Sequence, residues 1–345
     1  MSNFVQTRPG AATGSAEAPA PAIEVHDLVK TYPGGVRALR GLGFTVEPGT
    51  VFGLVGPNGA GKSTTVKILT TLSRPDSGRA SVAGIDVVQR PDRVRRAIGC
   101  VAQRSGVDLE ATGRENLALQ GHLYGLGGRE LRSRVGGLLE RLGLAEAADR
   151  ITRTYSGGMR RKLDVALGLV HRPQVLFLDE PTTGLDPEAR ADLWNEITRL
   201  SGEEGITVLL TTHYLEEADR LARRLAIVDS GRVVAAGTPD ELKAELRGDA
   251  IHVELESPEP DGAVRGALDR LQGVREVVLD GRAVRARVDS GATAVPAVLA
   301  ALESHGLAVS AVTIARPSLD DVYLRYAGRA FSQADTANRT DGAAR

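Results

Sequence analysis

Apolar residues in the first two thirds of the chain fall into short runs bounded by Gly, Pro or Asp, a pattern that predicts a series of strands. Amphipathic segments of helical spacing lie between the later strands, at residues 187–201 and 215–224. Strands that alternate with helices in this way favour a mainly parallel α/β sheet. The predicted strands are residues 22–32, the two apolar segments on either side of Glu47-Pro48-Gly49, and residues 174–179, 206–212 and 224–237.

A stretch of different periodicity interrupts these strands. Residues 113–150 follow a helical pattern that is polar on one side, without a strong strand among them. Helical spacing continues further along, because apolar residues recur at that spacing from Leu163 to Val170. We therefore expect a helical subdomain at about residues 104–172, inside a domain that spans residues 22–240.

A second alternation of strands and helices begins after residue 240. Its order, β-α-β-β-α-β, is that of a ferredoxin-like unit, with a hairpin turn at Asp280-Gly281. The segment has no phosphate-binding loop and no clustered metal ligands in its sequence, so we expect a separate accessory domain at residues 250–328 that serves dimer contact or regulation. Its predicted strands are residues 250–256, 274–280, 283–289 and 307–315, and its predicted helices are residues 261–272 and 292–305.

Both ends of the chain are rich in small and polar residues. Residues 1–21 and 329–345 therefore predict a disordered leader and a disordered tail. The leader lacks the apolar core of a signal peptide, and no apolar run in the sequence approaches the roughly 20 residues that span a bilayer. We expect a chain that stays in the cytosol and takes any membrane role through another chain.

The charges and the cysteine content exclude some classes of partner and site. Lys and Arg number 43 against 44 Asp and Glu, which gives a net charge of −1 over 345 residues. Such a chain lacks the basic field that drives binding to nucleic acid, so no nucleic-acid partner is expected. The one cysteine, Cys100, excludes an intrachain disulfide framework and a Cys-rich metal site, and a reducing compartment fits best.

The strand that ends near residue 55 runs directly into a glycine-rich loop, GPNGAGKST. This sequence matches the G-x-x-x-x-G-K-[ST] pattern in its required context, after a strand and at the start of a helix. The glycines let backbone N–H groups point at phosphate oxygens, Lys62 reaches the β- and γ-phosphates, and the Ser63 hydroxyl can bind Mg²⁺. The predicted nucleotide-binding residues are Gly56, Pro57, Asn58, Gly59, Ala60, Gly61, Lys62, Ser63 and Thr64.

Two acidic residues, Asp179 and Glu180, follow an apolar strand. In a chain with a phosphate loop, this position predicts one carboxylate on Mg²⁺ and a second that acts on a water in line with the γ-phosphate. The competing interpretation is a strand end with two solvated acids. His213 follows another strand and would point toward the same ligand crevice, although a lone histidine in such a place is more often structural.

A serine and two glycines, Ser156, Gly157 and Gly158, precede a helical segment. Each glycine disfavours a helix by about 1 kcal/mol relative to alanine, so two of them at a helix start need a reason. Bare backbone N–H groups at a helix start form an anion site, and the serine can cap the helix or donate to the anion itself. The alternative is a flexible turn before a surface helix.

Taken together, residues 22–240 resemble the ATP-binding cassette (ABC) family of P-loop NTPases. The resemblance implies a mainly parallel sheet, an antiparallel β subdomain and a helical subdomain, with ATP and Mg²⁺ as the bound groups. It makes Ser156-Gly157-Gly158 the family's signature, with Met159 in place of the usual Gln, which removes a polar contact but keeps the backbone donors. The other implied roles are adenine stacking for Tyr32, sensing of Mg²⁺ and the attacking water for Gln103, Mg²⁺ binding for Asp179, general base for Glu180, subunit contact for Asp186 and a γ-phosphate switch for His213.

The family resemblance also implies partners. Family members place the signature of one subunit against the phosphate loop of a second, so the one loop and one signature of this chain imply a homodimer. The segments ATGREN, LDEPTTGLDP and RPSLDDVYLRYAG are similar to ATPase subunits of the daunorubicin-resistance type of antibiotic exporter. This similarity implies a peripheral subunit on the cytoplasmic side of the cell membrane that powers export through a separate multispanning permease.

Two other functions remain open on the sequence alone. A soluble cassette ATPase that acts on nucleic acid or ribosomes would share the nucleotide motifs, but here the interval from Gly56 to Asp179 is compact and contains no heptads. An importer ATPase with a regulatory C-terminal domain would have the same nucleotide site. Residues 316–328 also have a competing structural interpretation, as an amphipathic helix that packs on the accessory domain.

Overall fold

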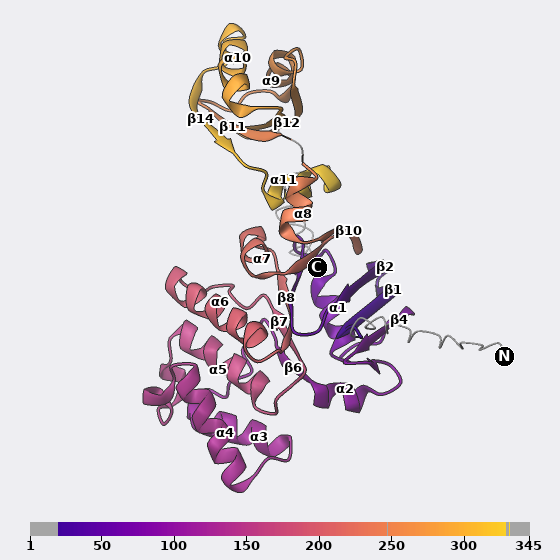
Figure 1. The fold of residues 1–345 in the computed structure, drawn as a ribbon, viewed down its shortest axis with the longest axis vertical. Helices are drawn as coiled ribbons and strands as arrows, with labels where there is room; N and C mark the ends of the chain where they lie inside the picture. Colours follow the sequence, from indigo (N-terminus) through magenta and orange to yellow (C-terminus); the bar gives the residue numbers. More distant parts are fainter. Residues whose placement is uncertain (1–19, 247, 329–330, 332–345) are drawn as a thin grey trace, which may run out of the picture.

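The computed structural model describes residues 20–246, 248–328 and 331, so the predicted leader and tail lie almost wholly outside the described residues. Two sheets and most of the helices form one large body, and a third sheet lies at the far end of the molecule with two helices of its own (Figure 1). Within the described residues, no helix is both long enough and apolar enough to cross a membrane.

A six-stranded sheet forms the centre of the large body. Its strand order is β10-β9-β3-β8-β7-β6; the strands from β9 to β6 run parallel to one another, and β10 pairs antiparallel with β9. Strands β3 and β8 are buried at every residue, as is typical of a parallel sheet covered on both faces. The strands are β3 (Val51–Val55), β6 (Ile98–Val101), β7 (Val175–Asp179), β8 (Thr207–Thr212), β9 (Arg224–Asp229) and β10 (Arg232–Gly237), and the helices packed on them are α1 (Lys62–Leu69), α2 (Pro91–Ala97), α5 (Gly157–Leu169), α6 (Pro187–Gly202) and α7 (Leu215–Leu221).

A second, antiparallel sheet has the strand order β2-β1-β4-β5. It shares an apolar core with β3 and α1, where the ring of Phe44 stacks on that of Phe52 with 5.1 Å between centroids. The sequence pattern predicts β1 and β2, but it does not predict the short elements β4, β5, α2 and β6. The strands of this sheet are β1 (Ile23–Tyr32), β2 (Val36–Val46), β4 (Ser77–Val82) and β5 (Ile85–Asp86).

The predicted helical segment forms a layer of helices at one end of the large body (Figure 1). Helix α3 begins with a capping box, because Thr112 Oγ1 accepts from the backbone N–H of Glu115 at 3.1 Å and the Glu115 carboxylate accepts from Thr112 N at 2.8 Å. The apolar faces of this layer meet in one core that includes Leu117, Leu138 and Leu163. Its elements are α3 (Gly113–Leu123), α4 (Gly128–Arg141), 3₁₀ turns at Ala145–Ala147 and Thr152–Thr154, and α5.

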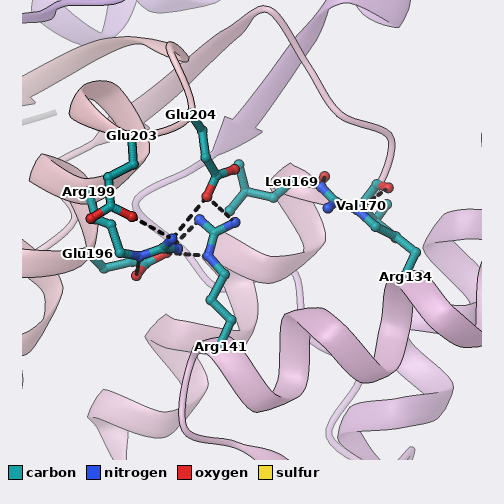
Figure 2. Close-up of polar contacts among 8 residues, drawn as sticks. All are labelled: Arg134, Arg141, Leu169, Val170, Glu196, Arg199, Glu203 and Glu204. Carbon is teal, nitrogen blue, oxygen red and sulfur yellow. Dashed lines mark hydrogen bonds and ion pairs between the residues drawn. The ribbon is translucent and has the colours of Figure 1, made fainter.

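A network of ion pairs joins this helical layer to α6 (Figure 2). Arg141 of α4 donates to Glu196 at 2.7 Å, and Arg199 donates to the same carboxylate at 3.0 Å. Both arginines also pair with Glu204, which follows α6. Burial raises the pKa of Glu196, and the hydrogen bond from Arg141 opposes that shift. The shared carboxylates therefore tie together two helices that are distant in the sequence.

The third sheet confirms the predicted β-α-β-β-α-β order. Its strands are antiparallel and lie in the order β12-β13-β11-β14, as in a ferredoxin-like fold. Helices α9 and α10 pack on the sheet and on each other, over a separate core that includes Ile251, Leu268 and Leu302. The elements are β11 (Asp249–Leu255), α9 (Asp261–Leu268), β12 (Val274–Asp280), β13 (Ala283–Val288), α10 (Gly291–Ser304) and β14 (Val309–Ala315).

The last helix, α11 (Leu319–Ala327), returns from this sheet to the large body. It packs on α7, α8 (Pro239–Ala244) and β10, and Leu319, Val322 and Tyr323 are at most 2% exposed there. The helix expected at residues 316–328 therefore forms, but the interpretation that packs it on the accessory domain is wrong. Its apolar face instead completes an apolar cluster of the cassette.

Candidate functional site

The glycine-rich loop connects β3 to α1 at the carboxyl end of the parallel sheet. Gly61 has a φ of 112°, in the left-handed region that favours glycine, and a Cβ on Gly56 would lie 2.2 Å from the carbonyl oxygen of Val228. The loop curls around Lys62, whose Nζ donates to the carbonyl oxygens of Gly56 at 2.7 Å and Pro57 at 3.1 Å. A buried lysine, a curled loop and the start of a helix together form a cradle that suits phosphate.

Asp179 ends β7 beside the first turn of α1. Its Oδ1 accepts from Ser63 Oγ at 3.4 Å and from Thr211 Oγ1. A hydroxyl and a carboxylate oxygen at one point fit Mg²⁺, which prefers oxygen ligands and usually completes its shell with water and substrate phosphates. In the part of the chain that the structure describes, no cluster of three or more His, Cys, Asp or Glu side chains could hold a metal ion, so a Mg²⁺ ion here would depend on such additional oxygens.

Glu180 follows β7 directly, with a φ of 47°, and its backbone N–H donates to the carbonyl oxygen of Thr211 at 3.0 Å. The residue is only 8% exposed, and three polar side chains surround its carboxylate: Gln103 Nε2 at 3.2 Å, His213 Nδ1 at 3.3 Å and Lys62 Nζ at 3.5 Å. Burial acts to raise the pKa of Glu180, but the interaction with His213 and the positive charge of Lys62 outweigh it, so the pKa is lowered. The side chain is therefore an ionised carboxylate at neutral pH.

Arg161, on α5, supports the backbone on either side of Glu180. The sequence pattern did not predict this role. Its guanidinium donates to three backbone carbonyls, those of Ala102 at 2.7 Å, Pro181 at 2.8 Å and Asp179 at 3.2 Å. The side chain is 7% exposed, and burial lowers the pKa of Arg161. One buried arginine thus joins α5 to the segments that carry Gln103 and Glu180.

Asp164, one helical turn after Arg161, is a second support that the sequence did not reveal. Its Oδ1 accepts from Ser105 Oγ at 3.1 Å and from the backbone N–H of Gly106 at 3.0 Å. Burial raises the pKa of Asp164, while these hydrogen bonds oppose the shift. The only available signal was a pair of charged residues inside an apolar helical pattern, and periodicity alone does not tell whether such charges are buried.

Ser156, Gly158 and Asp186 form a different neighbourhood. Ser156 caps α5 by accepting from the backbone N–H of Met159 at 3.2 Å, and Asp186 caps α6 by accepting from Ala189 N at 2.8 Å. A Cβ on Gly158 would lie 2.8 Å from the Cβ of Ala189, so glycine lets the two helix starts approach each other. A Cβ on Gly157, by contrast, would meet nothing within 4 Å, so α5 is open on that side.

The predicted site residues thus fall into two groups by their contacts. Tyr32 stands outside both, at the end of β1, with its ring centroid 5.8 Å from Lys30 Nζ. The remaining loop residues, Asn58, Gly59, Ala60 and Thr64, lie in the loop or on the first turn of α1. We call the first set the phosphate-loop group (Lys62, Ser63, Gln103, Asp179, Glu180 and His213) and the second the signature group (Ser156, Gly157, Gly158 and Asp186).

A phosphate loop at the edge of a parallel sheet, faced by two carboxylates, defines a P-loop nucleoside triphosphatase. The added antiparallel sheet and helical layer narrow the class to cassette ATPases. The chain belongs to the ATP-binding proteins of ABC transporters, since the family model described as ABC transporter matches residues 39–183 and relatives match most of the chain. Residues 237–327 match the C-terminal domain described as that of DrrA1-3-like ATP-binding proteins.

Two curated relatives and one solved structure illustrate the similarity. The chain is 50% identical over 307 residues to the daunorubicin resistance ATP-binding protein DrrA3 of Streptomyces coeruleorubidus, covering 89% of this chain and 96% of that protein. It is 45% identical over 315 residues to the daunorubicin/doxorubicin resistance ATP-binding protein DrrA of Streptomyces peucetius, covering 90% and 93%. A dimeric ATP-binding cassette in a post-hydrolysis state, bound to ADP and Pi, matches with 25% identity and a TM-score of 0.58, over 63% of this chain and 98% of that chain. The chain therefore binds and hydrolyses ATP.

Proposed function

We propose that the chain is the ATP-hydrolysing subunit of a drug or antibiotic exporter, and that it works as a homodimer on the cytoplasmic side of the membrane with a separate multispanning permease. The observation that carries the hydrolytic part is the buried Glu180 carboxylate, kept ionised by Lys62 and His213 beside the phosphate loop. The export part rests on the resistance functions in the names of the relatives.

In this proposal the phosphate-loop group divides the work of hydrolysis. Glu180 takes a proton from the attacking water. The water oxygen bonds to the γ-phosphorus, and the bond between the γ-phosphorus and the ADP oxygen breaks. Lys62 exchanges its carbonyl partners for the β- and γ-phosphate oxygens, and His213 donates to the γ-phosphate. Gln103 orients the attacking water, because its hydrogen bond to Glu180 places its amide beside the base.

Ser63 and Asp179 would hold Mg²⁺, with Gln103 as a further oxygen ligand when its amide turns from Glu180. The ion would neutralise charge on the β- and γ-phosphate oxygens. Thr211 keeps Asp179 oriented through its hydroxyl. Tyr32, whose ring centroid lies 5.8 Å from Lys30 Nζ, would stack on the adenine ring.

The signature group supports a homodimer. The start of α5 has backbone N–H groups, a capping serine and an open side at Gly157, and it approaches α6 on its other side, where Gly158 lies against Ala189. A second copy of the chain could bring its own ATP to this open end, as anions bind at helix starts. The dimeric cassette among the solved relatives makes such an arrangement reasonable.

An exposed apolar groove supports a permease as the partner. The groove has a volume of about 320 Å³ and lies between the end of α1, β6 and the end of α3, where the ring of Tyr124 stacks on His171 at 3.7 Å between centroids. Leu72 and Leu123, beside it, are each 74% exposed. An amphipathic helix from a cytoplasmic loop of a membrane protein would cover these side chains.

Drug efflux is the test of this function. When the chain is expressed in a drug-sensitive host together with a multispanning permease encoded in the same genome as its partner, we expect lower accumulation of an anthracycline such as daunorubicin. Leu72→Glu combined with Leu123→Glu should abolish efflux and leave the ATPase activity of the purified chain unchanged, whereas Leu109→Glu, at a leucine that is 42% exposed elsewhere, should not affect efflux. Unchanged accumulation with the wild-type pair would favour the importer or nucleic-acid alternatives.

A further inference from the structure

We propose that helix α11 is a positioning element of the ATPase: it holds the phosphate loop and the His213 segment in place, and Tyr323 is its central residue. The proposal goes beyond the hydrolytic roles given above, and rests on them only in taking Lys62 and His213 as functional. The helix packs on α7, α8 and β10, and it acts on the phosphate-loop group through three contacts.

The helix is fixed in place at both ends. At its start, a capping box links Ser318 and Asp321, with Ser318 N donating to Asp321 Oδ2 at 2.9 Å and Asp321 N donating to Ser318 Oγ at 3.3 Å. At its end, Gly328 takes the left-handed conformation of a helix C-cap, with a φ of 70°. Arg325 and Tyr326 both hydrogen-bond to Glu245, at the end of α8. A helix anchored in this way can support other elements.

The first contact is made through an apolar cluster that α11 shares with β3, the strand that leads into the phosphate loop. Val55, the last residue of β3 and the neighbour of Gly56, is wholly buried in the same apolar cluster as Val322 and Tyr323. At 0% exposure, Tyr323 is the largest fully buried side chain among the described residues. The segment before the loop and α11 therefore share one buried apolar cluster.

The second contact is with the segment that carries His213. Leu215, two residues after His213, begins α7 and packs in the cluster with Leu319 and Tyr323, as does Ala218 one turn later. The backbone before His213 is also joined to the loop, because the N–H of Gly56 donates to the carbonyl oxygen of Thr212 at 3.3 Å. A shift of α11 would thus move both the phosphate loop and the segment that carries His213.

The third contact is polar. The hydroxyl of Tyr323 donates to Asp229 Oδ1 at 3.4 Å, at the end of β9. Asp229 leads into the β9–β10 turn, where the N–H of Gly231 donates to the carbonyl oxygen of Ala60 in the phosphate loop at 2.9 Å. A Cβ on Gly231 would lie 2.6 Å from the carbonyl oxygen of Ala38, so the turn has no free space on that side. Tyr323 therefore buttresses the turn that supports the loop.

Removal of the Tyr323 ring would leave a cavity into which Val55, Leu215 and β9 can relax. A displacement of about 1 Å in groups that position a reacting phosphate can cost as much as 10²-fold in rate. For Tyr323→Ala we expect ATP to bind about tenfold more weakly, and kcat to fall by a similar factor, since both the loop and His213 move. These changes should appear at temperatures well below the unfolding transition.

A matched control is available in the accessory domain. Leu302 is also 0% exposed, in a core that shares no residue with the cluster around α11. Leu302→Ala should lower the melting temperature and leave the affinity for ATP and kcat unchanged. If Leu302→Ala and Tyr323→Ala weaken ATP binding equally, α11 has no special role and the proposal fails.

The single tryptophan provides a readout that does not depend on activity. Trp194 of α6 donates through Nε1 to Glu217 of α7 at 2.9 Å, so its fluorescence reports the position of α7. We expect the emission of Trp194 to shift in Tyr323→Ala and to stay unchanged in Leu302→Ala. In Lys62→Ala, ATP binding should be lost without any shift in emission, which separates a failure of the proposed nucleotide site from a failure of the α11 proposal.

Two milder variants keep the proposal testable where Tyr323→Ala does not fold. Tyr323→Phe removes only the hydroxyl, and we expect an increase of about twofold to threefold in the KM for ATP, because the packing stays and the hydrogen bond to Asp229 is lost. Val322→Ala removes two methyl groups from the apolar cluster that contains Val55 and should give an intermediate loss. Wild-type KM, kcat and Trp194 emission in both variants would overturn the proposal.

Discussion

Two helices of the cassette, α1 and α5, begin beside glycine, and their first turns have very different surroundings. The start of α1 lies among charged groups: Lys62 and His213 are within 3.5 Å of the Glu180 carboxylate. The start of α5 has a capping serine and an open side at Gly157. Both helix starts suit an anion, but the ionisable groups for hydrolysis, Glu180, His213 and Lys62, lie at the start of α1. An open helix end without such groups is useful when the phosphate of another molecule approaches it, and so we expect the two ends to work in different subunits.

The largest effect is expected at the end that has the chemistry. Glu180→Gln removes the base and keeps the size of the side chain, so kcat should fall by about 10³-fold while ATP still binds through Lys62 and the loop. With ATP present the variant should accumulate as a dimer in size-exclusion chromatography. Hydrolysis within a few-fold of wild type would remove Glu180 from its role and make the two helix ends more alike than we propose.

Mixed dimers test whether the two ends act in different subunits. Lys62→Ala disables the phosphate loop and Ser156→Arg blocks the start of α5, so each homodimer should be inactive. If a site combines the loop of one chain with the signature of the other, a dimer of the two variants has both lesions in one site and an intact second site. We expect partial recovery of ATPase in the purified mixed dimer, with differently tagged chains. A dimer of wild type and Lys62→Ala is the control for turnover by a single site, and an inactive mixed dimer beside an active control would contradict the model.

A smaller effect is expected from the support of the metal-binding carboxylate. Thr211→Val removes the hydroxyl that donates to Asp179, and we expect the Mg²⁺ concentration for half-maximal ATPase to rise about tenfold, as is usual when a second partner of a metal ligand is lost. Thr207→Val is a matched control on the same strand, since its hydroxyl accepts from Gly49 N at the opposite end of β8. An equal change in both variants would assign the effect to β8 as a whole.

The smallest effect is expected where the helical layer that carries α5 meets α6. Glu196→Gln weakens the contacts with Arg141 and Arg199, and should lower the free energy of unfolding by about 1 kcal/mol, or a few degrees in melting temperature. ATP affinity at the start of α1 should not change. Glu110→Gln, in the exposed pair with Arg153, should have no measurable effect on thermal unfolding. A loss of ATP affinity in Glu196→Gln would show that the two helix ends are not independent.

The sequence was most informative where a residue type is dictated by backbone shape or by chemistry. The loop around Gly56 and Gly61 needs glycine for steric reasons. Asp179 ends an otherwise apolar strand and Glu180 follows it, so both features are recognisable without a structure. The ferredoxin-like order was also predictable, because its strands alternate clearly. By contrast, β4 and β5 are short and half exposed, and such segments give little periodic signal.

What the sequence could not give is which surfaces meet. The amphipathic pattern of α11 predicts a helix with one apolar face, but Leu319, Val322 and Tyr323 could cover the accessory sheet or the cassette equally well. Arg161 is similar: a charged residue in a helix is usually exposed, and its burial depends on three carbonyl groups from distant segments. Both facts require long-range packing that local pattern does not contain.

The backbone at Glu180 has a consequence for engineering. With a φ of 47°, this residue has a left-handed conformation that costs an L-amino acid with a side chain about 1–2 kcal/mol and costs glycine almost nothing. At position 180, thermal stability thus favours glycine, whereas turnover requires glutamate. Directed evolution that selects on melting temperature alone would favour substitutions at this position that relieve the backbone strain and abolish hydrolysis. A screen for thermostable variants of this ATPase therefore has to measure phosphate release as well.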